Sequence, residues 1–512
     1  MKLLRFGLLG SLILLSITIA SPQKSGNAAA TKSEIVWEAP RSISKSPEST
    51  STDPFLLSDP TGKVHLFWAE KMSAIEGNQP DTLMYAVWDG KNWFKSTDIF
   101  FAPESDGTPI IAYPHAVIDS TGKIHLIWLA QPNFPNYTLF YSSVFAPDAL
   151  LADNWSHQIA LASDLTGTKY SIDIAFRAEH EIHIVYARVQ QGSGAREERA
   201  VSYIRSLDGG ISWSDPIDIT SIKDTKRGAS DTRILMDSDR RIYTTWTEWG
   251  ESGLGEAIFF SRSLDNGDTW EPPIALSRKI GNEYERDWSN IEILGDNQLV
   301  VMWEGGWRAY RQAQYSEDGG KTWSEPIDTF PWLIGENGTV EFARDSNDQL
   351  HLFIAQRVRE GYESRGDGNN AAIWHSQWRG DYYWTEPTQV TEAVNLINPK
   401  VVITAGNLAV ATWYTQRDLE IMVSVGQITG APRIIQPNWA RSQILDILLQ
   451  ETVEVTETPT EPSANSMTPV PQVQVGPMVR VGGDDPIRPV AIGILSVLFA
   501  AGLILLLRKR NH

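Results

Sequence analysis

An eight-residue pattern recurs three times in the middle of the chain and restricts its folds more than any other feature. The copies read Ser-x-Asp-x-Gly-x-x-Trp and span Ser206–Trp213, Ser263–Trp270 and Ser316–Trp323. They are spaced by about 55 residues, and a proline follows each within three residues. A repeat of this period is typical of propellers and solenoids, in which each unit packs against the next one.

Each copy suits a tight turn between two antiparallel strands. Its glycine supplies the positive φ that such a turn needs, and its aspartate folds back onto backbone N–H groups. Its tryptophan begins the next strand and buries a large ring between neighbouring sheets. We therefore interpret these residues as structural: Asp208, Gly210 and Trp213, then Asp265, Gly267 and Trp270, then Asp318, Gly320 and Trp323.

This octapeptide resembles the Asp box of sialidase-like propellers built from BNR repeats, over roughly residues 200–330. Degenerate copies at Asp89–Trp93, Asn154–Trp155 and Gly380–Trp384 keep the turn and the tryptophan. The resemblance implies an all-β propeller of four-stranded blades.

A second pattern, a β-rich run after a turn, predicts the number of blades. It occurs seven times, at Asp59–Trp68, Asp119–Trp128, Glu181–Tyr186, Arg241–Trp246, Gln298–Trp303, Gln349–Ile354 and Asn407–Trp413. Seven runs favour seven blades, and six remain the alternative because the sialidases that share the Asp box have six. The isolated segment Ile35–Pro40 predicts that an N-terminal strand completes the last blade and closes the ring.

The two ends of the chain predict export and membrane anchoring. Basic residues precede an apolar run at the start, as in a signal peptide. The uncharged run Val490–Leu507 is long enough to span a bilayer, and the basic cluster after it predicts a cytoplasmic tail. We expect an extracytoplasmic head at the cell surface, with this division: signal-peptide region 1–30, propeller 34–440, largely disordered stalk 441–488, transmembrane helix 489–507 and cytoplasmic tail 508–512.

Composition excludes several classes of function. The net charge is −19, which disfavours nucleic acid as a partner. The chain has no cysteine, so disulfides and thiolate metal sites are excluded. It contains no Walker phosphate loop, no HExxH zinc motif and no G-x-S-x-G elbow. We expect no cofactor and no metal, and we interpret the recurring His65, His125, His183 and His351 as structural.

A ligand is expected at the end of the ring opposite the Asp boxes, where the loops are long and dissimilar. Alternation along the innermost strands predicts which side chains line the central channel. The predicted channel column is Phe55, His115, Asp173, Arg233, Asn290, Glu341 and Pro399. The next column, which includes Lys400, should pack between blades. Two residues before the channel column, a ring nearer the loops is predicted from Asp53, Tyr113, Ser171, Asp231, Trp288, Thr339 and Ile397.

The resemblance implies a site with three arginines that clamp a carboxylate, a Tyr–Glu nucleophile pair and an aspartate as acid and base. The early Phe/Tyr-Arg-Ile-Pro segment of that family is absent, and the corresponding strand reads Ser51–Phe55. Arg233 is the only arginine of the channel column, while Arg308, Arg311 and Arg417 lie in or beside the long loops.

Two functions therefore remain open. The favoured one is a non-catalytic head that binds a glycan or another surface ligand at the channel mouth. The alternative is an exo-sialidase or a related glycoside hydrolase that acts on acidic sugars. The candidate ligand residues are Tyr113, His115, Asp173, Asp231, Arg233, Arg308, Glu341 and Arg417.

Overall fold

A computed structural model describes most of the propeller between residues 35 and 428. The described segments are 35–44, 50–72, 80–103, 110–133, 136–165, 172–177, 180–189, 199–222, 228–249, 255–281, 283–306, 310–333, 339–357, 371–391, 396–415 and 419–428. The predicted signal peptide, stalk and transmembrane helix lie outside these segments. Within them, no helix has the length and apolarity needed to cross a membrane.

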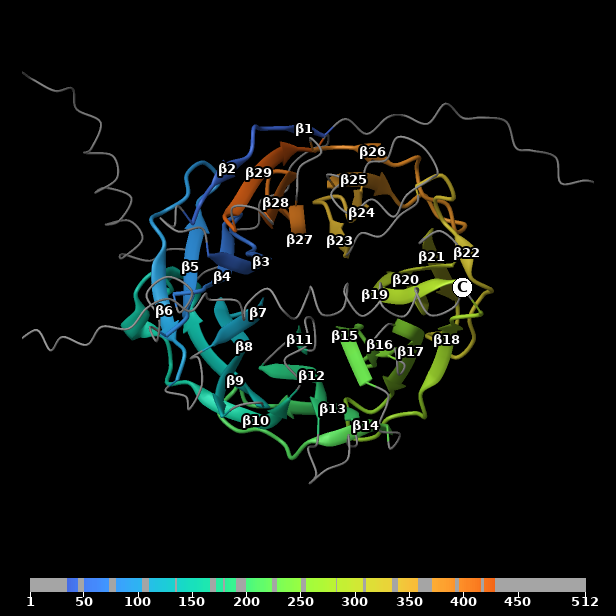
Figure 1. Cartoon of the computed structure of the whole chain (residues 1–512), viewed down its shortest axis with the longest axis horizontal. Helices are drawn as coiled ribbons and strands as arrows, with labels where there is room; N and C mark the ends of the chain where they lie inside the picture. The colour runs from blue at the N-terminus through green and yellow to red at the C-terminus, as the bar shows by residue number, and fades with distance from the viewer. Residues whose placement is uncertain are drawn as a thin grey trace, which may run out of the picture. The chain divides into compact units, whose positions relative to one another are not determined.

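Seven antiparallel blades surround a central channel (Figure 1), so the prediction of seven four-stranded blades is confirmed. The first three blades, each written from the channel outward, are β3 (Ser51–Ser58), β4 (Val64–Glu70), β5 (Thr82–Trp88) and β6 (Thr97–Phe101); β7 (Ile111–Ile118), β8 (Lys123–Asn133), β9 (Asn136–Phe145) and β10 (Ile159–Leu165); β11 (Ile172–Arg177), β12 (Glu181–Val189), β13 (Arg199–Ser206) and β14 (Ile217–Ile222). Two short 3₁₀ turns, η1 (Ala146–Asp148) and η2 (Ala152–Asn154), stand before β10.

The next three blades follow the same order around the ring. They are β15 (Gly228–Met236), β16 (Ile242–Trp249), β17 (Gly255–Ser263) and β18 (Ile274–Arg278); β19 (Tyr284–Gly295), β20 (Gln298–Gly306), β21 (Tyr310–Ser316) and β22 (Ile327–Asp328); β23 (Val340–Arg344), β24 (Leu350–Arg357), β25 (Ala371–Gln377) and β26 (Thr388–Gln389).

The seventh blade joins the two ends of the propeller. Its inner strands are β27 (Leu396–Thr404), β28 (Leu408–Thr415) and β29 (Ile421–Gln427). The N-terminal strands β1 (Val36–Trp37) and β2 (Arg41–Ser42) both pair with β29 on its outer edge. The predicted closure by the N-terminal strand is therefore confirmed, and it covers an edge that would otherwise be unpaired.

The hydrophobic core lies between the blades. Each of its seven clusters combines residues of two adjacent blades, including the pair formed by the first blade and the seventh. A fully buried tryptophan recurs at the same place in the second strand of five blades: Trp68, Trp128, Trp246, Trp303 and Trp413. Burial of such rings stabilises the ring of blades by about 2 kcal/mol or more each, since a blade alone cannot cover its own faces.

The Asp boxes connect the third and fourth strands of three blades. The φ angles of Gly210, Gly267 and Gly320 are 87°, 88° and 83°. In each box the carboxylate accepts a hydrogen bond from a backbone N–H four residues later, at 2.8 to 2.9 Å. These contacts are those of a turn, and they fix the start of the outermost strand.

Each Asp box also docks on the preceding blade. A Cβ atom on Gly210 would lie 1.9 Å from the Tyr141 hydroxyl, so only glycine fits. The Trp213 ring meets the same Tyr141 edge to face, with ring centroids 4.9 Å apart. Trp270 on Tyr203 and Trp323 on Phe260 repeat the arrangement. The boxes therefore join neighbouring blades as well as shaping turns.

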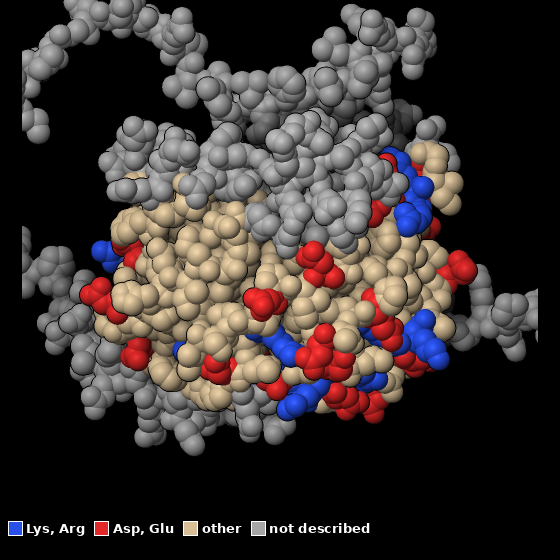
Figure 2. Space-filling view, turned by 90° about the horizontal axis from the view of Figure 1, so that it is seen from below, with Lys and Arg blue, Asp and Glu red and all other residues tan. Residues whose placement is uncertain are grey.

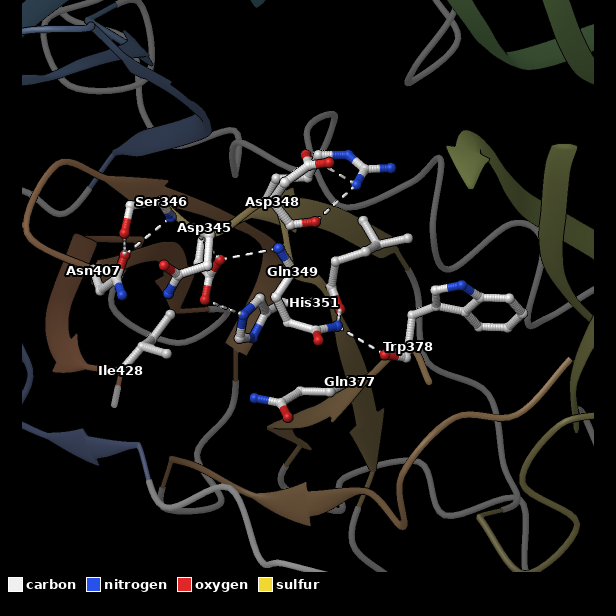
Figure 3. Close-up of polar contacts among 12 residues, drawn as sticks. Asp345, Ser346, Asp348, Gln349, His351, Gln377, Trp378, Asn407 and Ile428 are labelled. Atoms are coloured by element: carbon white, nitrogen blue, oxygen red, sulfur yellow. Dashed lines mark hydrogen bonds and ion pairs between the residues drawn. The ribbon is translucent and has the colours of Figure 1, made fainter. Parts of the chain in front are cut away.

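The turns between the first and second strands lie at the same end of the ring, which we call the Asp-box end. The backbone N–H of Gly319 in one box donates to Asn297, a residue of such a turn. In the sixth blade, Asp345 receives the backbone N–H of Gln349 and lies 3.4 Å from His351 (Figure 3). Asn407 of the seventh blade accepts the backbone N–H of Ser346 at 3.0 Å.

The recurring histidines belong to this turn network. His65 contacts Asp59 at 3.3 Å and the hydroxyl of Tyr85 at 2.6 Å. His125 repeats both contacts in the second blade, with Asp119 and Tyr141. The buried rings of His65 and His125 thus link a turn aspartate to a tyrosine of the third strand, which holds the turn against the sheet.

Candidate functional site

The pairing of the innermost strands fixes which residues share the channel. Six predicted members occupy equivalent positions: Phe55, His115, Asp173, Arg233, Asn290 and Glu341. With the seventh member identified below, we call this set the channel ring. The next column, for example Ile174 and Ile234, is buried between blades as predicted.

The predicted seventh member was wrong. Lys400, not Pro399, pairs with Thr412, the counterpart of Phe67 in the first blade. Lys400 lies thirteen positions before Trp413, the spacing that the other six members keep from the equivalent second-strand residue, whereas Pro399 lies fourteen positions before it. Lys400 therefore joins the channel ring, and Val401 takes the buried position that was predicted for Lys400.

Two neighbouring members of the channel ring form a polar pair. The Nδ1 atom of His115 lies 3.1 Å from a carboxylate oxygen of Asp173, whose other oxygen accepts the backbone N–H of Ile234 at 3.0 Å. Burial opposes ionisation of Asp173, but these hydrogen bonds and Arg233 outweigh it and lower its pKa. Burial also lowers the pKa of His115, against the pull of Asp173, so the imidazole is neutral at pH 7.

A second polar pair of the channel ring joins the sixth and seventh blades. The Nζ atom of Lys400 lies 2.6 Å from a carboxylate oxygen of Glu341. Burial lowers the pKa of Lys400, and the attraction of Glu341 offsets part of that effect. The ammonium is thus matched by a carboxylate at hydrogen-bond distance, as a buried charge requires.

Arg233 stands between carboxylates of two rings. Its guanidinium donates to the backbone carbonyl of Thr232 at 3.0 Å. Its charge lowers the pKa of Asp173 and opposes the rise that burial causes in the pKa of Asp231. Asp231 also accepts the hydroxyl of Ser230 at 3.0 Å. Within the described channel, Arg233 therefore lies close to the carboxyl groups of Asp173 and Asp231.

The ring nearer the loops, which we call the mouth ring, has an unusual backbone. Five of its members are non-glycine residues with φ between 50° and 60°: Asp53, Tyr113, Asp231, Trp288 and Asn398. Each lies where the pairing of its strand shifts register, which marks a bulge. Asn398 takes the place predicted for Ile397, for the reason given for Lys400. Thr339 is the sixth member, and Ser171 lies outside the described residues.

A small pocket lies beside the mouth ring where the seventh, first and second blades meet. Its volume is about 20 Å³, which holds a water molecule or one hydroxyl group but not a sugar ring. The described residues that line it are Asp53, Pro54, Phe55, Tyr113, Pro114, His115, Asn398 and Lys400. Four predicted ring members, Asp53, Phe55, Tyr113 and His115, thus meet at one pocket with Asn398 and Lys400, which the sequence did not assign to either ring.

The other candidate arginines do not join Arg233 in the described part of the chain. Arg311 is fully buried, donates to Glu304 at 3.0 Å and to the carbonyl of Ala355 at 2.9 Å, and so joins the fifth and sixth blades. Arg308 and Arg417 lie outside the described residues. Lys400 is the second cation of the described channel. It lies thirteen positions before the second-strand tryptophan, and this fixed spacing could have identified it from the sequence.

The described surface and side-chain clusters add two observations. On the side of the ring drawn in Figure 2, acidic and basic residues are interspersed, without a field of one sign on its described part. Within the segments that the structure describes, no three histidine or acidic side chains gather in a way that could hold a metal ion.

Known proteins resemble the chain in its repeats and in part of its length. The family described as BNR/Asp-box repeat matches residues 314–325, which contain the third box. A sialidase of Clostridium perfringens is 28% identical over 152 residues, which cover 26% of this chain and 37% of that relative. The chain therefore matches little more than a third of the length of this curated relative.

Two solved structures are similar over a larger share of the chain. A protein of unknown function from Dyadobacter fermentans has a TM-score of 0.47 and 13% identity, over 77% of this chain and 99% of its own. A leech intramolecular trans-sialidase has a TM-score of 0.43 and 12% identity, over 77% of this chain and 70% of its own. The Asp boxes, the propeller and the match to the BNR/Asp-box repeat together support a sialidase-like β-propeller built from BNR repeats.

Proposed function

We propose that this propeller is the extracytoplasmic head of a membrane-anchored protein and binds a glycan at the loop end of its channel without catalysis. One observation carries the proposal. The cations of the described channel are matched by carboxylates, with Lys400 on Glu341 at 2.6 Å and Arg233 beside Asp173 and Asp231. A clamp for a substrate carboxylate needs unmatched arginine forks, so this arrangement favours a binding site over sialidase chemistry.

The residue types of the mouth ring support a glycan as the ligand. Tyr113 and Trp288 offer aromatic faces, and Asp53 and Asn398 offer hydrogen-bond acceptors and donors for hydroxyl groups. A rigid ring of blades holds these side chains in place, which is how binding residues are usually presented. A relative that matches part of the chain is named a sialidase, which is consistent with a sugar as the ligand.

The alternative is an exo-sialidase or a related glycoside hydrolase for acidic sugars. Asp231 favours it, because burial raises the pKa of this carboxyl against the effect of Arg233. A carboxylic acid with a raised pKa is what a general acid requires. The half-buried Tyr113, next to the channel, is a candidate for an aryl nucleophile.

Binding and turnover assays on the purified full chain separate the two functions. We expect binding to some members of a glycan array and no release of dye from fluorogenic sialosides or other glycosides. A matched pair of variants, Arg233→Lys and Arg233→Ala, serves as the control. Turnover that disappears in Arg233→Ala would establish the enzyme and end the binding-only account.

Anchoring is tested separately, because it rests on the terminal sequences. We expect the wild-type chain to stay with membranes after a carbonate wash and its head to be cleaved by external protease. A chain that ends before Val490 should be released. Retention of that shortened chain in the membrane would contradict the proposed anchor.

A further inference from the structure

The mouth ring is not uniform around the channel. Between the fourth and fifth blades, Asp231 receives the backbone N–H of Trp288 at 3.4 Å. Between the sixth and seventh, Thr339 donates its hydroxyl to the carbonyl of Pro399 at 3.1 Å. In these places the mouth ring links one blade to the next, and its polar atoms are occupied by the protein itself.

The arc across the seventh, first and second blades differs. Asp53, Tyr113 and Asn398 border the pocket there, and they share the left-handed backbone of Asp231 and Trp288. Each such residue costs roughly 1–2 kcal/mol, a strain that is found most often at ligand sites. Within the described residues, neither the Tyr113 hydroxyl nor the Asn398 amide makes a hydrogen bond to the protein, although both residues are half-buried.

The charge of Asp53 acts on three tyrosine hydroxyls. Burial and then the charge of Asp53 raise the pKa of Tyr113, and Asp53 acts in the same direction on Tyr137 and Tyr414. All three phenols are therefore protonated at neutral pH and available as donors. Asp53 itself accepts the hydroxyl of Thr52 at 3.0 Å and makes no ion pair among the described residues.

The charges around the pocket disfavour an anion. Of the two basic side chains that line it, Lys400 is matched by Glu341 and His115 is neutral at pH 7. Asp53 adds a carboxylate to the wall, and a carboxylate repels an acidic ligand group at short range. Hydroxyl groups, by contrast, find both acceptors and donors in the pocket.

We propose that the arc of Asp53, Tyr113 and Asn398 is a subsite that takes one hydroxyl or hydroxymethyl group of a neutral sugar and rejects acidic sugars. The inference rests on the proposed glycan-binding function and narrows its ligand class. The pocket volume of about 20 Å³ suits a single group of this size, so the sugar ring lies outside it, over the mouth ring.

The test compares neutral oligosaccharides with the same oligosaccharides carrying sialic or glucuronic acid, printed side by side on an array with the full chain as the probe. We expect every bound pair to favour the neutral member by about tenfold or more. Equal or stronger binding of the acidic members would overturn the subsite and leave glycan binding intact. Binding of no glycan at all would overturn the proposed function itself.

Substitutions locate the subsite. Asp53→Asn should reduce the ratio of the affinity for neutral glycans to that for acidic glycans by about tenfold. Tyr113→Phe should weaken the binding of neutral glycans by about tenfold, because the hydroxyl is lost. Asp348→Asn is the matched control, because Asp348 also has left-handed backbone but is exposed at the Asp-box end. Unchanged binding in both test variants, with unfolding temperatures equal to that of the wild type, would overturn the assignment.

Discussion

The two ends of the propeller are built on opposite principles. At the Asp-box end, the same contacts recur from blade to blade: a carboxylate on a turn, a glycine against an aromatic ring, a histidine on an aspartate. At the loop end, equivalent positions hold different residues, from Asp53 to Tyr113 to Trp288. The repeated contacts join the blades, whereas different side chains at equivalent backbone positions are what a specific ligand site needs.

Positive φ angles occur at both ends of the propeller, but on different sets of residues. At the Asp-box end, positive φ falls on many glycines, where it costs little, and also on turn residues such as His180, Arg240 and Tyr382. At the mouth ring it falls on tyrosine, tryptophan, aspartate and asparagine. The left-handed residues of the mouth ring therefore cost stability, which the Asp-box end and the cores between blades offset.

A glycine substitution at the Asp-box end should be the most damaging change. Gly210→Ala would place a Cβ atom 1.9 Å from the Tyr141 hydroxyl in a residue with φ of 87°, so we expect a loss of about 3–4 kcal/mol in the free energy of unfolding. Gly90→Ala is the control: its φ is 98°, but nothing lies within 4 Å, so about 1 kcal/mol is expected. Equal losses in chemical unfolding would show that Asp-box docking is unimportant.

The paired charges of the channel come next. Lys400→Met leaves the carboxylate of Glu341 without its partner at 2.6 Å, and we expect a loss of about 2–3 kcal/mol. The double variant Lys400→Met/Glu341→Gln should recover most of it, since no unmatched charge remains. Unfolding by guanidinium measures all three proteins, and an equally unstable double variant would speak against the pair.

An Asp-box carboxylate should matter less. Asp318→Ala removes hydrogen bonds from the backbone and the hydroxyl of Thr322, and we expect a loss of about 1–2 kcal/mol because the group is exposed. Asp215→Ala is the control. Asp215 is exposed and lies outside the Asp box, so its substitution should have almost no effect on the unfolding midpoint. A similar loss in both variants would remove the special role of the boxes.

Acid should weaken the structure through its buried histidines. Burial lowers the pKa of His183 and of His375 to about 3, whereas an unfolded histidine binds its proton near pH 6.5. The unfolded chain therefore takes up more protons, and the free energy of unfolding falls as the pH drops below about 6.5. His183→Gln should remove about 1 kcal/mol of the loss between pH 6.5 and 5.5, and an unchanged pH dependence would contradict its buried neutral state.

Much of the fold followed from the sequence because the repeats carry it. The Asp boxes and the seven β-rich runs predicted the blades, and the isolated segment Ile35–Pro40 predicted the closure. The seventh channel member was missed because the alignment placed Pro399, fourteen positions before Trp413, where the other blades keep a spacing of thirteen. The left-handed mouth ring was missed as well, since ordinary residues at bulges have no sequence signature comparable to glycine.

The site was predictable only in outline. Alternation along the strands placed His115, Asp173, Arg233 and Glu341 in the channel. It could not indicate which side chains pair with one another, because pairing depends on distances across the ring between residues about 60 positions apart. Residues of three blades form the pocket beside Tyr113, so no pattern within one segment of the sequence could predict it.

The division of labour between the two ends can be tested by measuring stability and glycan affinity together in two variants, Asp318→Asn and Asp53→Asn. We predict that Asp318→Asn lowers the unfolding midpoint and keeps the affinity and the neutral preference of the wild type. Asp53→Asn should keep the midpoint and lose about tenfold in its preference for neutral over acidic glycans. The reverse result, with affinity changed by Asp318→Asn and only stability changed by Asp53→Asn, would contradict the account.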